Sequence, residues 1–252
     1  MRLPKRLLFV FLMMLCLWSC KQPIPRADNS IDYIPENNES VIKIAHLETT
    51  ATDFTASKLL AQLNEPVLYD FLKNESDFIS RLKTKGESVI CFQKMGDSLR
   101  HFTLITHTNP TVFVLDSTYQ NETKVNAYKG HQIAENTFGG TSNYSARVDS
   151  MFVASSSEVI LKDIIDNNTK QSATFKKAYA LKTKDGLVSL IQPHAIRIND
   201  SLTLNFASQA ALELQVFPDG ISASGVVLDR DSLPQLLNVF HGLHPQPNRS
   251  AT

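Results

Sequence analysis

Cys20 has the most clearly defined chemical setting of any reactive side chain in this sequence. Three basic residues (Arg2, Lys5 and Arg6) precede an unbroken apolar run of twelve residues, 7–18, and Cys20 follows closely after that run. A helix needs about twenty apolar residues to cross the hydrocarbon core, so the run is too short to span a membrane and is typical of a secretory signal peptide. The alternative is a buried apolar helix that ends in Cys. The basic flank and the position at the amino terminus favour the signal peptide.

The residues before Cys20 indicate which modification its thiol would receive. Leu17-Trp18-Ser19-Cys20 resembles the lipobox of bacterial lipoproteins, with an apolar residue at minus three, a small residue at minus one and Cys at plus one. The resemblance implies cleavage before Cys20, a diacylglycerol on its sulfur and a third acyl chain on the new amino terminus. One chain gives only marginal membrane binding, whereas three hold a protein permanently. We therefore expect residues 1–19 to be a signal peptide and the mature protein to be tethered through Cys20.

Asp-Ser followed by an apolar residue or Thr is a second chemical pattern. It occurs five times among fifteen Asp residues, where residue frequencies predict about one occurrence. The triplets resemble the O-glycosylation motif of exported Bacteroidota proteins, in which Asp precedes the modified hydroxyl. The competing explanation is local structure, because Asp and Ser both favour turns and the next residue begins a strand or helix. The candidate acceptors are Ser98, Ser117, Ser150, Ser201 and Ser232.

No strong catalytic or metal-binding motif accompanies these residues. Gly-x-Ser-x-Gly, His-Glu-x-x-His, the phosphate-binding Gly-x4-Gly-Lys-Ser/Thr loop and Gly-x-Gly-x-x-Gly are all missing. The weak metal candidates are His241 and His244, with His194 as a third ligand. His241 ends a predicted helix, where an imidazolium suits the dipole, and His244 lies in a Pro-rich tail that would not hold ligand geometry. His101 and His107 share one face of a predicted strand, which we interpret as a solvent-facing stripe. We expect no catalytic residues, metal or cofactor.

Composition argues against nucleic acid as a partner. The chain has 25 basic and 25 acidic residues, and removal of the signal takes away three basic residues and no acidic ones. No run of Lys and Arg is longer than Lys176-Lys177, so the basic stripe that binds phosphates is missing. In the mature chain Cys20 would be acylated, and Cys91 would be the only free thiol. An intramolecular disulfide is therefore excluded. Cys91 lies in a strand-like stretch, so we expect its side chain to be buried like that of a small apolar residue.

The first half of the chain predicts two helices followed by short strands. Residues 20–30, with Pro23 and Pro25 and little apolar content, are assigned to a spacer after the anchor. A first strand is predicted at 40–45, and helical spacing over 53–73, broken at Pro66, predicts two helices before a short amphipathic turn at 76–83. Beyond Gly86, alternation predicts an antiparallel meander. Its strands are expected at 89–93, 99–107, 111–115, 124–128, 131–138 and 151–154.

The second half repeats this order with fewer helices. Ser155, Ser156 and Ser157 place hydroxyl caps ahead of a helix that begins near Glu158. Strands follow at 187–192, 195–198, 202–206, 211–217 and 221–228, and a last helix is predicted at Ser232–His241. We therefore predict an α+β fold of mostly antiparallel sheet with a few flanking helices, in one body over 31–242. The alternative is two similar lobes that meet near 167–177. Residues 243–252 are expected to form a disordered tail.

Four stretches resemble the amino-terminal part of large uncharacterised lipoproteins of Flavobacteria and their relatives. They are Tyr33-Ile-Pro-Glu36, 211–228 with its Pro-Asp-Gly turn, 231–240 and 244–247. Members of this family are several hundred residues longer, so the resemblance implies that this chain is a short version or a truncated reading frame. Some relatives carry a ribonuclease label. The sequence lacks the acidic cluster of metal-binding ribonucleases, and its charge balance does not suit an RNA substrate.

These features predict a cell-envelope lipoprotein that is not an enzyme. The favoured function is a non-catalytic binding or scaffold module whose partner is another envelope protein. The alternative is a carrier of an apolar ligand or lipid in a concave antiparallel sheet, and a hydrolase is the third possibility. A large apolar concavity would favour the carrier, and a flat solvated sheet the scaffold. Surface lipoproteins of Bacteroidota carry acidic residues just after the Cys, whereas 21–26 has none, so we expect anchoring in the outer membrane facing the periplasm.

Overall fold

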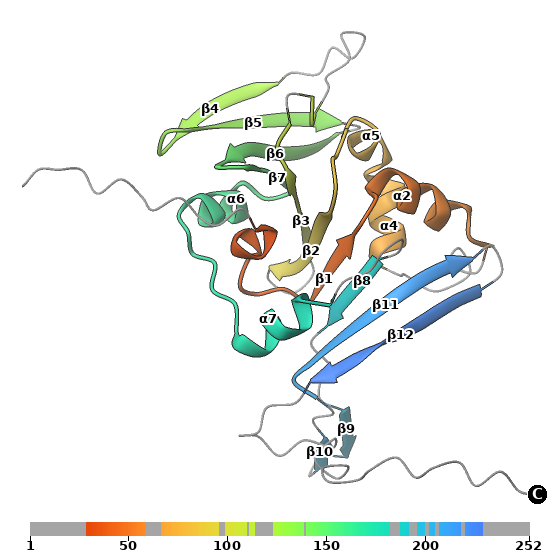
Figure 1. The fold of residues 1–252 in the computed structure, drawn as a ribbon. Helices are drawn as coiled ribbons and strands as arrows, with labels where there is room; N and C mark the ends of the chain where they lie inside the picture. The colour runs from red at the N-terminus through yellow and green to blue at the C-terminus, as the bar shows by residue number, and fades with distance from the viewer. Residues whose placement is uncertain are drawn as a thin grey trace, which may run out of the picture.

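A ten-stranded antiparallel sheet forms the centre of the fold (Figure 1). The computed structural model describes residues 29–58, 67–95, 99–109, 111–113, 123–138, 140–181, 187–191, 196–199, 202–204, 207–217 and 220–228. The strand order is β12-β11-β8-β1-β2-β3-β7-β6-β5-β4. Their bounds are β1 Ser40–Ile44, β2 Ser88–Met95, β3 Leu99–His107, β4 Lys124–Tyr128, β5 His131–Phe138, β6 Thr141–Val148, β7 Met151–Ser155, β8 Leu187–Ile191, β11 Gln209–Phe217 and β12 Gly220–Leu228. A separate pair contains β9 (Ile196–Asn199) and β10 (Leu202–Leu204).

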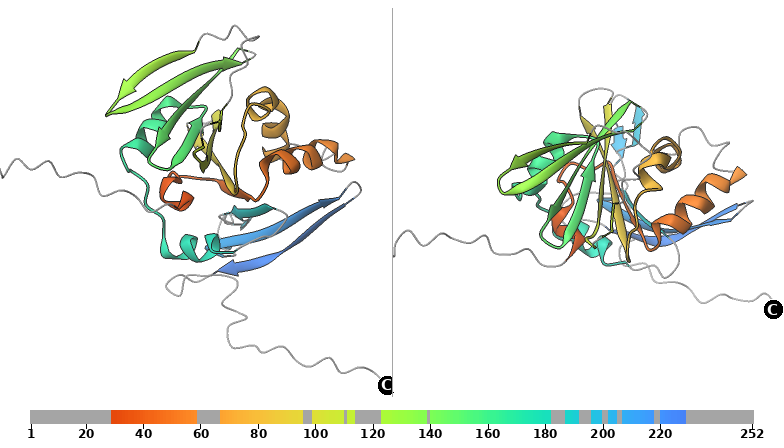
Figure 2. Two further views of the ribbon diagram at one scale, coloured as in Figure 1. Left: turned by 45° about the horizontal axis from the view of Figure 1, so that its top comes forward. Right: turned by 90° about the horizontal axis from the view of Figure 1, so that it is seen from above.

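Helices cover both faces of the central strands (Figure 2). One face carries the 3-10 helix η1 (Ser30–Tyr33) with α6 (Glu158–Ile165) and α7 (Ala173–Tyr179). The other face carries α2 (Leu47–Ala56), α4 (Val67–Asn74) and α5 (Ser76–Ile79). Among the helices that the structure describes, none has the length and apolar content that a membrane span requires.

The two hydrophobic clusters arise from alternation along the strands. Successive side chains of a strand point to opposite faces, and in β1 the Val41 side chain packs into the η1–α6–α7 cluster while Ile42 packs into the α2–α4–α5 cluster. A strand that is buried on both faces reads as a continuous apolar run. In β1 this run is interrupted by Lys43, which is only 4% exposed.

The predicted α+β class with mostly antiparallel sheet is confirmed. Of the two helices expected on either side of Pro66, the second corresponds to α4, whereas α2 begins and ends earlier than the first, and Pro66 itself lies outside the described residues. The ten-stranded sheet contains strands from both sides of 167–177, the segment considered as a junction between lobes. That segment instead contains the start of α7, which the sequence analysis did not predict. The Ser172 hydroxyl caps this helix by accepting from the Phe175 N–H at 3.1 Å.

Three local predictions differ from the structure. The strand expected at 111–115 is a turn over 111–113, with one isolated bridge between Phe113 and Leu82. Strand β6 was not predicted, because its sequence Thr-Ser-Asn-Tyr-Ser-Ala-Arg-Val is largely polar. Ser30, assigned to the spacer, is buried and its hydroxyl lies 2.6 Å from the Tyr179 hydroxyl. Ser30 therefore packs with the body, and the Asn29 side chain before it accepts from the Ile31 N–H.

Candidate binding groove

The β11–β12 hairpin extends beyond the part of the sheet that helices cover on both sides (Figure 1). Its strands pair along their whole length, from Gln209 opposite Leu228 to Phe217 opposite Gly220. The first residues of β11 are buried, whereas all residues of β12 from Ile221 to Val227 are exposed. Gly225 permits the close approach of the two strands, because a Cβ there would lie 2.0 Å from the Ala211 carbonyl oxygen.

One face of the hairpin is apolar. Residues that are paired directly across two antiparallel strands lie on the same face, so Leu214 and Ala223 share a face, as do Val216 and Ile221. Leu214 and Val216 pack against the α2–α4–α5 cluster. The opposite face carries the polar side chains of Glu213, Gln215, Ser222 and Ser224.

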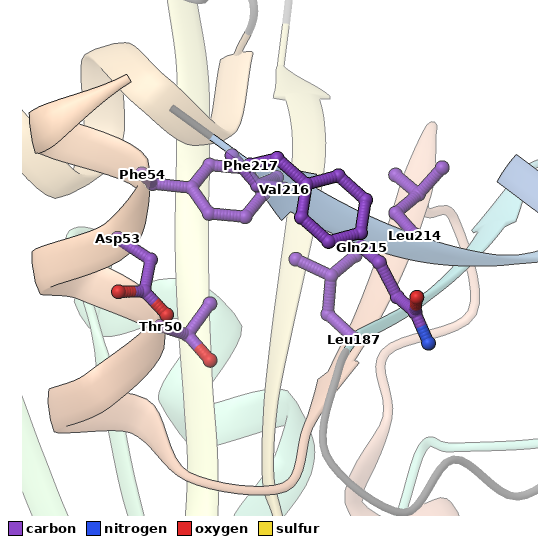
Figure 3. Close-up of a pocket in the computed structure, with 8 residues that line it drawn as sticks. All are labelled: Thr50, Asp53, Phe54, Leu187, Leu214, Gln215, Val216 and Phe217. Carbon is purple, nitrogen blue, oxygen red and sulfur yellow. The ribbon is translucent and has the colours of Figure 1, made fainter. Parts of the chain in front are cut away.

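A groove of about 290 Å³ lies between α2 and the apolar face of β11 (Figure 3). Helix α2 supplies one wall, and β8 and β11 supply the other. The apolar lining is Phe54, Leu187, Leu214, Val216 and Phe217, and the polar lining is Thr50, Asp53 and Gln215. Asp53 and Gln215 are exposed, whereas Phe54 and Leu187 are buried, so the groove has an apolar floor and a polar rim. Such a lining can hold an alkyl or aromatic group whose polar end stays in water.

The hairpin carries exposed apolar side chains on both faces: Ile221 and Val227 share the face of Leu214 and Val216, and Phe217 and Val226 belong to the other face. Six large hydrophobic residues are exposed in the part of the chain that the structure describes, and four of them belong to the hairpin: Phe217 (47% exposed), Ile221 (37%), Val226 (41%) and Val227 (40%). Single exposed apolar residues need no explanation, but a cluster of them marks an interaction surface. The hairpin is therefore the best candidate for a binding surface among the described residues.

Lys43 is the centre of a buried polar network on the other face of the sheet. Its ammonium donates to the carbonyl oxygens of Tyr179 (2.9 Å) and Leu181 (3.0 Å), just after the last turn of α7. It also lies 3.3 Å from the Glu87 carboxylate and 4.4 Å from the centroid of the Tyr179 ring. The Tyr179 hydroxyl donates to Glu87 at 3.2 Å, and burial raises the pKa of this phenol well above its usual value. Because Lys43 and Glu87 together hold the end of α7 against the sheet, we interpret the network as structural.

A second charged cluster joins the β4–β5 turn to the end of α6. The Asp166 carboxylate accepts from the Tyr128 hydroxyl at 3.0 Å and forms an ion pair with Lys129 at 2.8 Å. The hydrogen bond from Lys129 lowers the pKa of Asp166 below its usual value. Lys129 occupies the left-handed region (φ 45°) in the tight turn and is exposed. The cluster fixes the turn and faces no cavity that we identify among the described residues.

Most residues that the sequence analysis singled out lie outside the described ranges. This applies to Cys20, to the histidines His194, His241 and His244, to the helix expected at 232–241 and the tail at 243–252, and to Ser98, Ser117, Ser201 and Ser232. Within the described ranges there is no group of three or more His, Cys, Asp and Glu side chains that could hold a metal ion. Cys91 is fully buried, as predicted, and burial raises the pKa of its thiol far above the usual range.

The expectation of a solvent-facing stripe at His101 and His107 is wrong. Thr103 and Ile105 lie between them on the same face of β3 and are fully buried, and Ile105 belongs to the η1–α6–α7 cluster. His101 is half-buried, and its Nδ1 lies 3.2 Å from the Ser156 hydroxyl oxygen. The two ends of this face carry polar residues, His101 and His107, because β3 is longer than the helices that cover the face.

Ser150 is the one candidate acceptor that the structure describes. It lies half-buried in the tight turn between β6 and β7, and its carbonyl oxygen accepts from the Thr108 N–H at 2.8 Å. Asp149 before it adopts a left-handed conformation (φ 53°) and accepts from the Tyr33 hydroxyl at 3.0 Å. Asp tolerates this conformation better than most residues. The left-handed turn and the hydrogen bond from Tyr33 are therefore sufficient to explain why Asp occupies position 149.

The groove was missed by the sequence analysis, because its walls come from 50–54, 187 and 214–217. The alternation in β11 predicted a strand with an apolar face. The pairing of that strand with β8 and its position against α2 depend on long-range contacts.

Comparisons with known proteins add little to this description. No protein-family model matches the chain, and no curated protein matches it. Two crystal structures of TP0453 are similar in fold at low sequence identity. Crystal form I has a TM-score of 0.48 at 9% identity and covers 85% of this chain and 84% of that chain. Crystal form III has a TM-score of 0.44 at 7% identity and covers 85% of both chains. A similarity this low carries no inference about function.

Proposed function

We propose that this protein is a lipid-anchored, non-catalytic binding module of the cell envelope that takes an apolar group of a partner protein into the groove between α2 and β11. The observation that carries the proposal is the apolar floor of the groove together with the exposed Phe217, which lines it, and the exposed Ile221, which shares the face of Val216. Burial of one large apolar side chain stabilises a complex by about 1.5–3 kcal/mol before the costs of association. Phe217, which lines the groove, and Ile221, which pairs with Val216, would each contribute a gain of this size as part of a larger interface.

A photo-cross-linker at Phe217 tests this proposal. We expect p-benzoylphenylalanine at Phe217, in the native membrane, to give one discrete protein adduct. Val216→Asp, which places a carboxylate in the apolar lining, should reduce that adduct at least tenfold. The matched control carries the same probe at Val125, which is exposed on β4 at the far edge of the sheet. Equal labelling from both positions, or labelling that Val216→Asp leaves unchanged, would contradict the proposal.

An apolar-ligand carrier is the second candidate, and the lining of the groove favours it. Phe54, Leu187 and Leu214 form a largely buried floor, and about 290 Å³ lies near the lower end of the range for small-ligand pockets, roughly 300–1,000 Å³. A carrier purified in mild detergent should retain lipid at near one molecule per chain and lose it on Val216→Asp. The absence of a protein adduct from Phe217 together with retained lipid would select the carrier.

The anchor and location complete the proposal. Cys20 carries the lipid, a short spacer connects it to the body, and the body faces the periplasm from the outer membrane. The lipobox supports the first statement and the lack of acidic residues at 21–26 supports the last. The resemblance to the amino-terminal region of Flavobacteria lipoproteins agrees with an envelope location.

We also propose that Asp-Ser triplets are glycosylated, with Ser98, Ser117 and Ser201 as the best acceptors, because each follows Asp at a predicted turn. The native protein should then be heavier than the product of a host without the pathway, in discrete glycan increments. Changing these three residues to Ala should shrink the difference, and the fold should stay intact because exposed substitutions cost about 0.5 kcal/mol or less. Ser150→Ala is the control. If the native mass equals that of the acylated polypeptide, the glycosylation proposal is wrong, and turn geometry explains the Asp-Ser triplets.

A further inference from the structure

We infer that two copies of this protein pair through the free edge of β12, in an antiparallel register centred on Ser224. β12 is the outermost strand of the sheet and pairs with β11 over all nine of its residues. Its other edge has no strand partner among the described residues. The backbone N–H and C=O groups of such an edge form a template for another strand.

The β12 edge lacks the features that normally prevent pairing. Natural edge strands are protected by short length, by charged residues such as Lys, or by Pro. The opposite edge strand, β4, follows this rule, because it has five residues and begins at Lys124. By contrast, residues 220–228 contain no charged residue and no Pro, and residues 221–227 are all exposed. The difference between the two edges indicates that the β12 edge is used for association.

The sequence of β12 fits a second copy of itself. An antiparallel pair centred on Ser224 places Ile221 opposite Val227 and Ala223 opposite Gly225, and this register uses the whole strand. Directly opposed residues share a face, so the apolar face of one copy adjoins the apolar face of the other. No like charges meet across the pair, since the strand has none. Two-fold pairing of identical surfaces is also the commonest symmetry of soluble oligomers.

The pairing has a consequence for the groove. Ile221 and Val227 share a face with Leu214 and Val216, which line or adjoin the groove. A two-fold axis perpendicular to the sheet keeps this face on one side, so the dimer presents two grooves side by side on one continuous sheet. The inference does not depend on what the groove binds. Tethering of both copies to one membrane would raise their effective concentration.

Cysteine cross-linking of the full-length protein in its native membrane tests the register. We expect Ser224→Cys to form a disulfide-linked dimer on mild oxidation, because the two Cys residues would lie directly opposite each other across the axis, within the reach of a disulfide. Ser222→Cys is the matched control: it is equally exposed on the same strand. The two copies of residue 222 would lie about 13 Å apart along the strands, beyond the roughly 7 Å limit for a disulfide. Cross-linking that is equal for both variants, or absent from Ser224→Cys, overturns the inference.

A charge on the axis provides a second readout that does not require oxidation. Ser224→Lys would place two ammonium groups opposite each other, and we expect it to raise the dimer dissociation constant at least tenfold in sedimentation equilibrium of the full chain in mild detergent. Asn126→Lys, on the exposed opposite edge strand β4, should change the constant less than twofold. A circular dichroism melt of each variant reports whether the fold is retained. A monomer at all concentrations for the parent chain, or equal effects of the two substitutions, overturns the inference.

Discussion

Replacing Cys20 by Ala is expected to move the protein from the membrane fraction to the soluble fraction. The mature chain would lose the three acyl chains that hold it, at about 0.8 kcal/mol for each buried CH₂. Fractionation by centrifugation and metabolic labelling with an alkyne palmitate analogue measure the two effects, and the label should disappear completely.

Cys16→Ala is the matched control for this experiment. Cys16 lies in the apolar run four residues before Cys20 and would leave with the signal peptide, so its replacement should preserve both membrane partition and label. Unchanged partition of the Cys20→Ala protein would show that another segment holds the chain on the membrane, and the lipoprotein proposal would then be wrong.

Replacing Lys43 by Met is expected to lower the free energy of unfolding by about 3 kcal/mol. Lys43 is 4% exposed, and its ammonium donates to the carbonyl oxygens of Tyr179 and Leu181 and pairs with Glu87. Met fills a similar volume, so the loss comes from polar groups and not from a cavity. The two carbonyl oxygens at the end of α7 lose a donor, and the Glu87 carboxylate loses its cation. Denaturant unfolding measures the change, and hydrogen exchange should rise first in α7.

Lys124→Met is the control for Lys43. Lys124 lies exposed at the start of β4, where substitution should change stability by about 0.5 kcal/mol or less. A loss for Lys43→Met no larger than that for Lys124→Met would mean that water replaces the ammonium without cost. The structural interpretation of the network would then be incorrect.

Local patterns in the sequence were sufficient to predict most elements. Alternation predicted β5, β8 and β12 within one residue at each end, because the side-chain period of a strand is a local property. Helical spacing after Pro66 predicted α4 for a similar reason, since Pro is excluded from a helix interior and favours a helix that begins after it. The lipid anchor at Cys20 is also a local prediction, because it depends on the nineteen residues before the Cys.

Elements that tertiary contacts stabilise were harder to predict. Strand β6 is held by pairing with both β5 and β7, although its sequence is largely polar. Helix α7 is short, and Lys43 from a distant strand satisfies carbonyl groups just after its last turn. The strand expected at 111–115 failed for the opposite reason: alternation was present, but only one bridge, Leu82 to Phe113, forms in the described part. Tertiary pairing overrides local propensity in each case.

The sequence alone determined the α+β class of short antiparallel strands and the burial of Cys91, and it predicts the anchor signal, because these depend on periodicity, composition and adjacent residues. Only the tertiary structure decided which strands are neighbours: β1 lies between β2 and β8, and β11 and β12 form one edge. Strand order depends on contacts between residues far apart in the chain, which no local pattern encodes. The same long-range pairing buries Lys43, brings α2 against β11 to form the groove, and leaves the uncharged edge of β12 without a strand partner among the described residues.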